Sequence, residues 1–133
     1  MPAIRTKCVW TAIDREHDGL RILVTRYTVR GCSGTRYNVW MPNLAPSEPL
    51  LKAYHAEKIN WKEFTRRYKL ELFEPALMDK ENERIKNYGQ KFTLRLIKEL
   101  ARRQPVTLLC QCSEDTDCCH RHLLKAVLES AKV

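Results

Sequence analysis

One stretch decides how the whole chain is interpreted: Val106-Thr107-Leu108-Leu109-Cys110-Gln111-Cys112-Ser113-Glu114-Asp115-Thr116-Asp117-Cys118-Cys119-His120-Arg121-His122. Its first five residues form a short apolar run between turn signals, which is typical of a strand buried on both faces of a sheet. A helix is expected from Cys118 to about Ala131, capped by a side chain between Asp115 and Asp117. The stretch therefore predicts a strand-turn-helix with cysteines, histidines and an arginine at the junction, where α/β proteins usually bind ligands.

Length and composition predict one soluble domain spanning residues 1–133. A chain of 133 residues can bury a sizeable core without disulfides. No apolar run approaches the roughly 18 residues of a membrane span, so we expect no membrane association and a cytoplasmic location. The net charge of +8 favours anionic partners, either a small ligand or nucleic acid, although a solvated basic surface explains it equally well.

The flanking sequence predicts strands followed by helices. Strands are expected over 4–13, 20–29 and 37–41, and helices over 47–58, 60–72 and 79–103. Ser47 and Asn60 are the expected caps of the first two helices. In the third helix, one apolar stripe is expected to contain Ile85, Tyr88, Phe92, Leu96 and Leu100. This order predicts the α/β class, as a three-layer-like domain with a small mixed or parallel sheet covered by helices.

Thiol chemistry is the first interpretation of the cysteine cluster. A cysteine in the first turn of a helix tends toward the thiolate, and a neighbouring Arg121 lowers its pKa further. Cys112 or Cys119 would then be the nucleophile or redox thiol, with His120 as the base. A disulfide between Cys112 and Cys119 would be one oxidised form.

Zinc binding is the second interpretation, because zinc prefers mixed cysteine and histidine ligands. A helix would present Cys118 and His122, or Cys119 and His122, on one face, and Cys110 or Cys112 would supply the remaining ligands. The third interpretation is that these thiols only fill buried space. That reading is favoured for Cys110, which lies inside the apolar strand.

Arginines in an earlier loop predict an anion site. If the strand over 20–29 runs parallel to Val106–Cys110, then Arg30 and Gly31 face Cys112 and the start of the last helix. Arg26 and Arg121 would complete this site for a small anionic ligand. Alternatively, Arg26 and Arg30 pair with an acid such as Asp14 or Glu71 and merely order the loop.

Several motifs resemble those of the YeaO-like family, domain of unknown function family 488. They include Asp18-Gly19, Arg30-Gly31, Leu44-Ala45-Pro46-Ser47, Arg67-Tyr68 and Val106-Thr107-Leu108-Leu109, in that order. Where many relatives have arginine-leucine-tryptophan-proline-arginine-glycine, this chain has Arg26-Tyr27-Thr28-Val29-Arg30-Gly31. Cys112 and Cys119-His120-Arg121 resemble another branch of the superfamily. The resemblance implies an α/β fold and no particular reaction.

Two functions remain open on the sequence. One is a thiol-dependent enzyme or redox protein acting on a small anionic ligand at the carboxyl edge of the sheet. The other is a binding module without catalysis, either zinc-stabilised or associated with nucleic acid.

Overall fold

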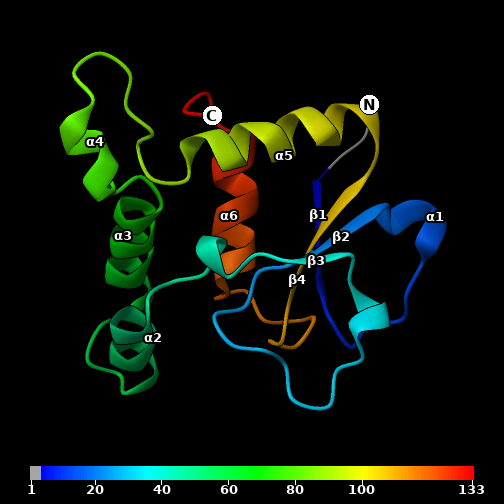
Figure 1. Ribbon diagram of the computed structural model, residues 1–133. Coiled ribbons are helices and arrows are strands. Elements are labelled where there is room, and N and C mark those ends of the chain that lie inside the picture. The colour runs from blue at the N-terminus through cyan, green and yellow to red at the C-terminus, as the bar shows by residue number, and fades with distance from the viewer. Residues whose placement is uncertain (1–3) are drawn as a thin grey trace.

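The computed structural model describes residues 4–133 as an α/β domain built on a parallel sheet (Figure 1). Within these residues the sheet has the strand order β1-β4-β2-β3, and every pair is parallel, which confirms the predicted class. The strands are β1 (Ile4–Cys8), β2 (Leu20–Leu23), β3 (Val39–Trp40) and β4 (Val106–Cys110). The helices are α1 (Arg15–Asp18), α2 (Glu48–His55), α3 (Trp61–Leu72), α4 (Leu77–Glu81), α5 (Lys91–Arg103) and α6 (His120–Glu129).

The central strand is β4, as its apolar sequence predicts. All its residues are buried, and it pairs with β1 on one side and β2 on the other. The register places Cys110 beside Cys8, so both strands end together at the same edge of the sheet. Side chains that follow β4 therefore emerge at the carboxyl edge.

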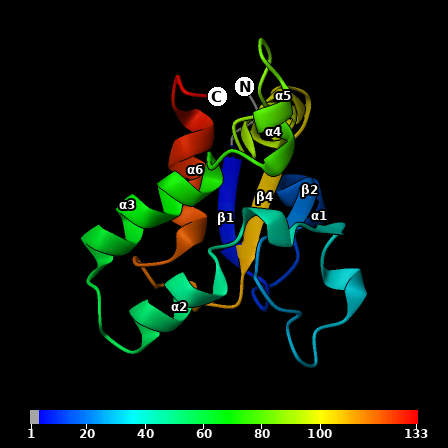
Figure 2. The ribbon, with the colours of Figure 1, turned by 60° about the vertical axis from the view of Figure 1, so that its left-hand side comes forward.

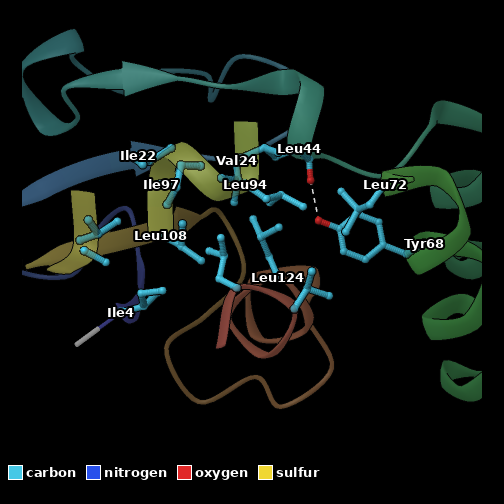
Figure 3. Packing of buried hydrophobic residues seen from close by; sticks show 14 of the residues in the cluster. Ile4, Ile22, Val24, Leu44, Tyr68, Leu72, Leu94, Ile97, Leu108 and Leu124 are labelled. Atoms are coloured by element: carbon cyan, nitrogen blue, oxygen red, sulfur yellow. Dashed lines mark hydrogen bonds between the residues drawn. The ribbon is translucent and has the colours of Figure 1, made fainter. Parts of the chain in front are cut away.

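The main core lies between one face of the sheet and the helices α3, α5 and α6 (Figures 2 and 3). Leu108 and Ile22 from the sheet belong to the same apolar cluster as Tyr68, Leu94 and Leu124 from the three helices. The opposite face has a smaller cluster, to which a loop after β2 contributes. That cluster contains Val9, Leu23, Val29 and Leu109. The layers are thus unequal, with the long helices on one face and mainly loops on the other.

Two strands are shorter than the sequence pattern predicts. β1 ends at Cys8, whereas the expected strand continued to Ile13, and β2 ends at Leu23, whereas the expected strand continued to Val29. The amide of Val24 still donates to Leu109 O at 3.0 Å. Beyond it the Thr25 hydroxyl donates to Tyr27 O and stabilises a turn. Local side-chain hydrogen bonds therefore override the β propensity of this segment.

The prediction of one helix over 79–103 is wrong, because this region forms two separate helices, α4 and α5, joined by a non-helical segment. Tyr88 and Gly89 both have positive φ, and a Cβ on Gly89 would lie 2.5 Å from Leu72 O. The predicted stripe is also wrong, since most of its members are exposed. The buried face of α5 contains Leu94, Ile97 and Ala101 instead.

The helix caps are confirmed in two cases and wrong in one. Ser47 accepts from the Leu50 amide, and Asn60 accepts from the Glu63 amide. The last helix begins two residues later than predicted, and its N-cap is Cys119, whose side chain makes no capping bond. No helix in residues 4–133 is long and apolar enough to cross a membrane.

A buried ion cluster at the start of β2 joins β1, α1 and β2, and a further hydrogen bond links it to β4. Asp18 is completely buried and accepts from Lys7 Nζ at 3.0 Å and from the Arg21 guanidinium. Its backbone oxygen accepts from the Thr107 hydroxyl of β4 at 2.8 Å. This cluster, which links α1 to the middle of the sheet, was not predicted from the sequence.

Gly19 provides a test of the close packing at the start of β2. It has φ of 60°, and an added Cβ would lie 2.0 Å from Pro105 O, which accepts from the Leu20 amide. Gly19→Ala should therefore lower the free energy of unfolding by more than about 1 kcal/mol. Urea unfolding measures the loss. Gly34→Ala is the control, because a Cβ there meets nothing within 4 Å, and it should change stability by less than about 0.5 kcal/mol.

Asp18→Asn should destabilise the fold by about 3–5 kcal/mol at pH 7, because it leaves Lys7 and Arg21 charged and buried. Burial raises the pKa of Asp18, but hydrogen bonding to the Asp14 amide and the neighbouring cations outweigh this and lower it. The stabilising contribution is therefore present above the unfolded pKa of about 3.9 and is lost as the pH falls through the lower folded pKa.

Urea unfolding of wild type and Asp18→Asn should accordingly differ less as the pH falls below about 4. The exposed carboxylate of Asp14, which pairs with His17, provides the control. Asp14→Asn should cost no more than about 1 kcal/mol. An equal effect of the two substitutions at pH 7 would contradict a structural role for the buried ion cluster.

Candidate functional site

Four side chains that carry sulfur or imidazole meet where β4 ends and α6 begins. The sulfurs of Cys110 and Cys119 and a ring nitrogen of His120 all lie within 4.8 Å of one another. Cys112 joins them, since the Cys110 thiol donates to Cys112 Sγ at 3.9 Å. We call Cys110, Cys112, Cys119 and His120 the thiol cluster. Cys112 is its exposed member, and the other three residues are buried.

The imidazole of His120 is held in one orientation. Its Nε2 lies 2.7 Å from Val24 O, and because a carbonyl only accepts, Nε2 carries the proton. The Nδ1 lone pair then faces Cys119 Sγ at 3.9 Å. Burial lowers the pKa of His120, so the neutral ring is favoured. His120 is therefore better suited to accept a hydrogen bond or ligate a metal than to carry a proton as the general base.

Arg121 fixes the loop that carries Cys112. Its side chain is almost completely buried, and it donates to Cys112 O at 3.0 Å and to Ser113 O at 2.8 Å. The same guanidinium lies 3.9 Å from Cys119 Sγ. Arg121 thus places a positive charge beside Cys119 Sγ, while most of its N–H groups donate to backbone carbonyls of the cysteine loop.

The cysteines of the thiol cluster have divergent pKa values. Hydrogen bonds from Cys110 and Cys119 lower the pKa of Cys112, and the nearby Arg121 acts in the same direction. Donation to Cys112 raises the pKa of Cys110 to about 11. The neighbouring thiols and burial raise the pKa of Cys119 as well. Negative charge in the cluster is therefore concentrated on the exposed sulfur.

Two residues of the predicted zinc set lie outside the thiol cluster. Cys118 is exposed and lies beside Tyr54, whose pKa is raised by burial and by this neighbouring thiol. Both ring nitrogens of His122 have partners, the Thr6 hydroxyl at 3.3 Å and Thr116 O at 2.8 Å. The cluster instead contains Cys110 and His120.

Of the arginines predicted to bind an anion in the loop after β2, Arg26 is used by the protein itself and Arg30 is exposed. Arg26 donates to Ala45 O and Pro46 O, both at 2.9 Å, so its guanidinium holds the loop before α2. Neither acid considered from the sequence is its partner. Arg30 and Gly31 are exposed, and the loop that contains them leaves the sheet at the same edge as the cysteine loop, since β2 and β4 are parallel. The parallel pairing of β2 and β4 that this placement requires is observed.

Cys110 is the member that the sequence analysis assigned to packing. Cys110 and Cys112 are two residues apart, and side chains with that spacing on a strand point to the same face of the sheet. This spacing predicts from the sequence that their two sulfurs lie close together. His120, which the sequence named as the base, reaches the cluster because Cys119 and not a residue at 115–117 is the N-cap of α6.

A large hollow in the described part of the chain lies away from the thiol cluster. It has a volume of about 1000 Å³ and lies beside α3, α5 and the C-terminal residues. Lys69, Phe73, Tyr88, Lys91 and Arg95 are among its lining residues. The cysteine chemistry is therefore located at an exposed edge of the sheet and not in this hollow.

Fold and site together define an α/β protein with a parallel sheet and a cysteine-histidine cluster at its carboxyl edge. The family described as the active DUF488-N3 subclade, DUF488-N3a, matches residues 4–132. The chain belongs to this family, as the resemblance predicted.

Curated relatives carry the names of uncharacterised proteins. The chain is 31% identical over 103 residues to Uncharacterized protein YeaO of Escherichia coli strain K12, which covers 76% of each chain. It is 34% identical over 77 residues to Uncharacterized protein Rv3073c of Mycobacterium tuberculosis strain H37Rv, covering 56% of this chain and 64% of the relative. No solved structure matches the chain significantly.

Arg121→Lys tests whether the guanidinium holds the cysteine loop. A lysine cannot donate to several carbonyls in the same planar arrangement, so unfolding free energy should fall by at least about 2 kcal/mol. Hydrogen exchange of residues 112–119 should accelerate in parallel. Arg66→Lys is the control, because Arg66 pairs with Glu63 on the exposed face of α3, and it should change stability by less than about 1 kcal/mol. Unchanged exchange in the cysteine loop would contradict the anchoring role.

Proposed function

We propose that this protein is a thiol-dependent redox enzyme in which Cys112 attacks a small anionic disulfide. The observation that carries the proposal is the position of Cys112 Sγ, exposed at the sheet edge and 3.9 Å from the buried sulfur of Cys110. Thiol-disulfide exchange begins with an accessible thiolate and passes through a mixed disulfide, which a neighbouring second thiol can resolve within the same chain. The cluster geometry favours this function over a purely structural use of the cysteines.

The reaction proceeds through a mixed disulfide. The Cys112 thiolate attacks one sulfur of the substrate and expels the other as a thiolate. A buried thiol, Cys110 or Cys119, then gives up its proton and attacks Cys112 Sγ, which releases the second substrate thiolate. The protein loses two electrons, and the substrate disulfide becomes two thiols: one takes up the proton of the buried cysteine and the other the proton that Cys112 had released to solvent. The sulfurs must approach from 3.9 Å to the bonded distance of about 2.05 Å.

An anionic substrate is supported by the charge around the edge. The exposed Arg30 and Gly31 lie in the neighbouring loop at the carboxyl edge, and the whole chain has a net charge of +8. Glutathione disulfide, which carries several carboxylates, is a suitable probe. A positive surface raises the encounter rate with such a molecule at low ionic strength.

The test is the oxidation of the reduced, metal-free full chain by glutathione disulfide. We expect two glutathione molecules to be released per chain, with an intramolecular disulfide between Cys112 and either Cys110 or Cys119 identified by peptide mass mapping. Cys112→Ser should abolish both the release and the disulfide.

Cys118→Ser is the matched control, because Cys118 is also exposed in the same loop but lies outside the thiol cluster. It should react like the wild type. A mixed disulfide on Cys118 as the sole product, or normal turnover by Cys112→Ser, would rule out the proposed attacking thiol.

A further inference from the structure

We infer that the thiol cluster also binds one soft divalent metal ion of the zinc type, through the sulfurs of Cys110, Cys112 and Cys119 and Nδ1 of His120. This inference goes beyond the proposed redox function and does not depend on it. It replaces the zinc set expected from the sequence, since both ring nitrogens of His122 have other partners and Cys118 lies outside the group of close donor atoms.

The spacing of the donor atoms fits tetrahedral coordination. Zinc with Zn–S bonds of about 2.3 Å places its sulfur ligands about 3.8 Å apart. The sulfurs of Cys110 and Cys112 are 3.9 Å apart, and Cys119 Sγ lies 3.9 Å from His120 Nδ1. The sulfurs of Cys110 and Cys119 and the ring nitrogen of His120 all lie within 4.8 Å of one another. Cys112 lies outside this group of three and is close to Cys110, so its loop must bring the fourth sulfur closer to Cys119 and His120 when a metal ion binds.

The histidine has the orientation of a metal ligand. Metal-bound imidazoles usually donate their second N–H to a backbone carbonyl or a carboxylate, which fixes the tautomer and the ring plane. The Nε2 proton of His120 is engaged in this way by Val24 O, and Tyr68 contacts the ring edge-on with centroids 5.8 Å apart. The Nδ1 lone pair is thereby directed at the cysteines before any ion arrives.

Charge balance explains the buried arginine beside the cluster. A divalent ion with three thiolates and a neutral imidazole carries one net negative charge, and Arg121 supplies one positive charge at 3.9 Å from Cys119 Sγ. Buried charges are tolerated when they are compensated locally. Among the residues that the structure describes, Arg121 Nε is one of two buried side-chain atoms without a hydrogen-bond partner. A more negative cluster would stabilise this guanidinium.

The elements that carry the ligands are already fixed. Cys110 ends the central strand, and Cys119 and His120 begin α6. Cys112 lies between them, in a loop whose carbonyls are held by Arg121. Little conformational entropy is therefore lost on binding, which favours high affinity. Coordination of Cys112 would also block its attack on a disulfide, so the metal-bound and redox-active forms exclude each other.

Cobalt(II) titration of the reduced full chain tests the inference, because tetrahedral thiolate coordination gives visible d–d bands and an intense sulfur-to-cobalt charge-transfer band. We expect saturation at one equivalent and loss of both signals when Zn²⁺ is added. Cys112→Ser should lower the charge-transfer absorbance by about one third, as one of three thiolates is removed, and weaken metal binding at least tenfold. Cys118→Ser should leave spectrum and affinity unchanged.

Buried ligands are better tested without substitution. X-ray absorption of the zinc-loaded wild type should show three sulfur ligands and one nitrogen ligand. An oxygen-rich shell, an absent charge-transfer band, or a spectrum lost in Cys118→Ser but kept in Cys112→Ser would overturn the inference. The outcome is separate from the redox test, which uses metal-free protein and measures released glutathione.

Discussion

The parallel pairing of β4 with both β1 and β2 is the constraint on which the rest of the structure depends. This strand is buried along its whole length, and it aligns the ends of its two neighbours at one edge. Its last residue, Cys110, therefore reaches the edge together with the chain that continues from β2. Because α6 packs against β1 and β4, its first turn returns His120 to the same place. The thiol cluster is a direct product of this topology.

Polar anchors around the cluster make the site specific. Val24 O fixes the tautomer of His120, and Arg121 fixes the loop carbonyls that follow Cys110. Neither anchor is itself a thiol, yet each determines where a thiol or a lone pair points. The two proposed chemistries, disulfide exchange and metal binding, use the same convergence of sulfurs and differ in whether Cys112 is free or coordinated.

Sequence reasoning predicted the parts of the fold that depend on local patterns. The apolar run of β4, the caps at Ser47 and Asn60 and the α/β class are confirmed, because each follows from periodicity or capping chemistry. The break before α5 was missed because it depends on the close approach of Gly89 to Leu72 O, a contact between distant segments. The sequence also indicated the right junction and named Cys112, Cys119 and His120, but its zinc set included Cys118 and His122, which lie outside the thiol cluster.

The connection of the first strand to the last has a consequence for how the chain acquires its structure. β1 has no strand neighbour in the described sheet other than β4, and Ile4 pairs with Val106 from near the other end of the chain. Such contacts carry a high loop-closure cost and slow folding. On a ribosome, β1 therefore cannot take its place in the sheet until β4 has emerged. The sulfur-bearing junction, which follows β4 in the sequence, is assembled only after that point.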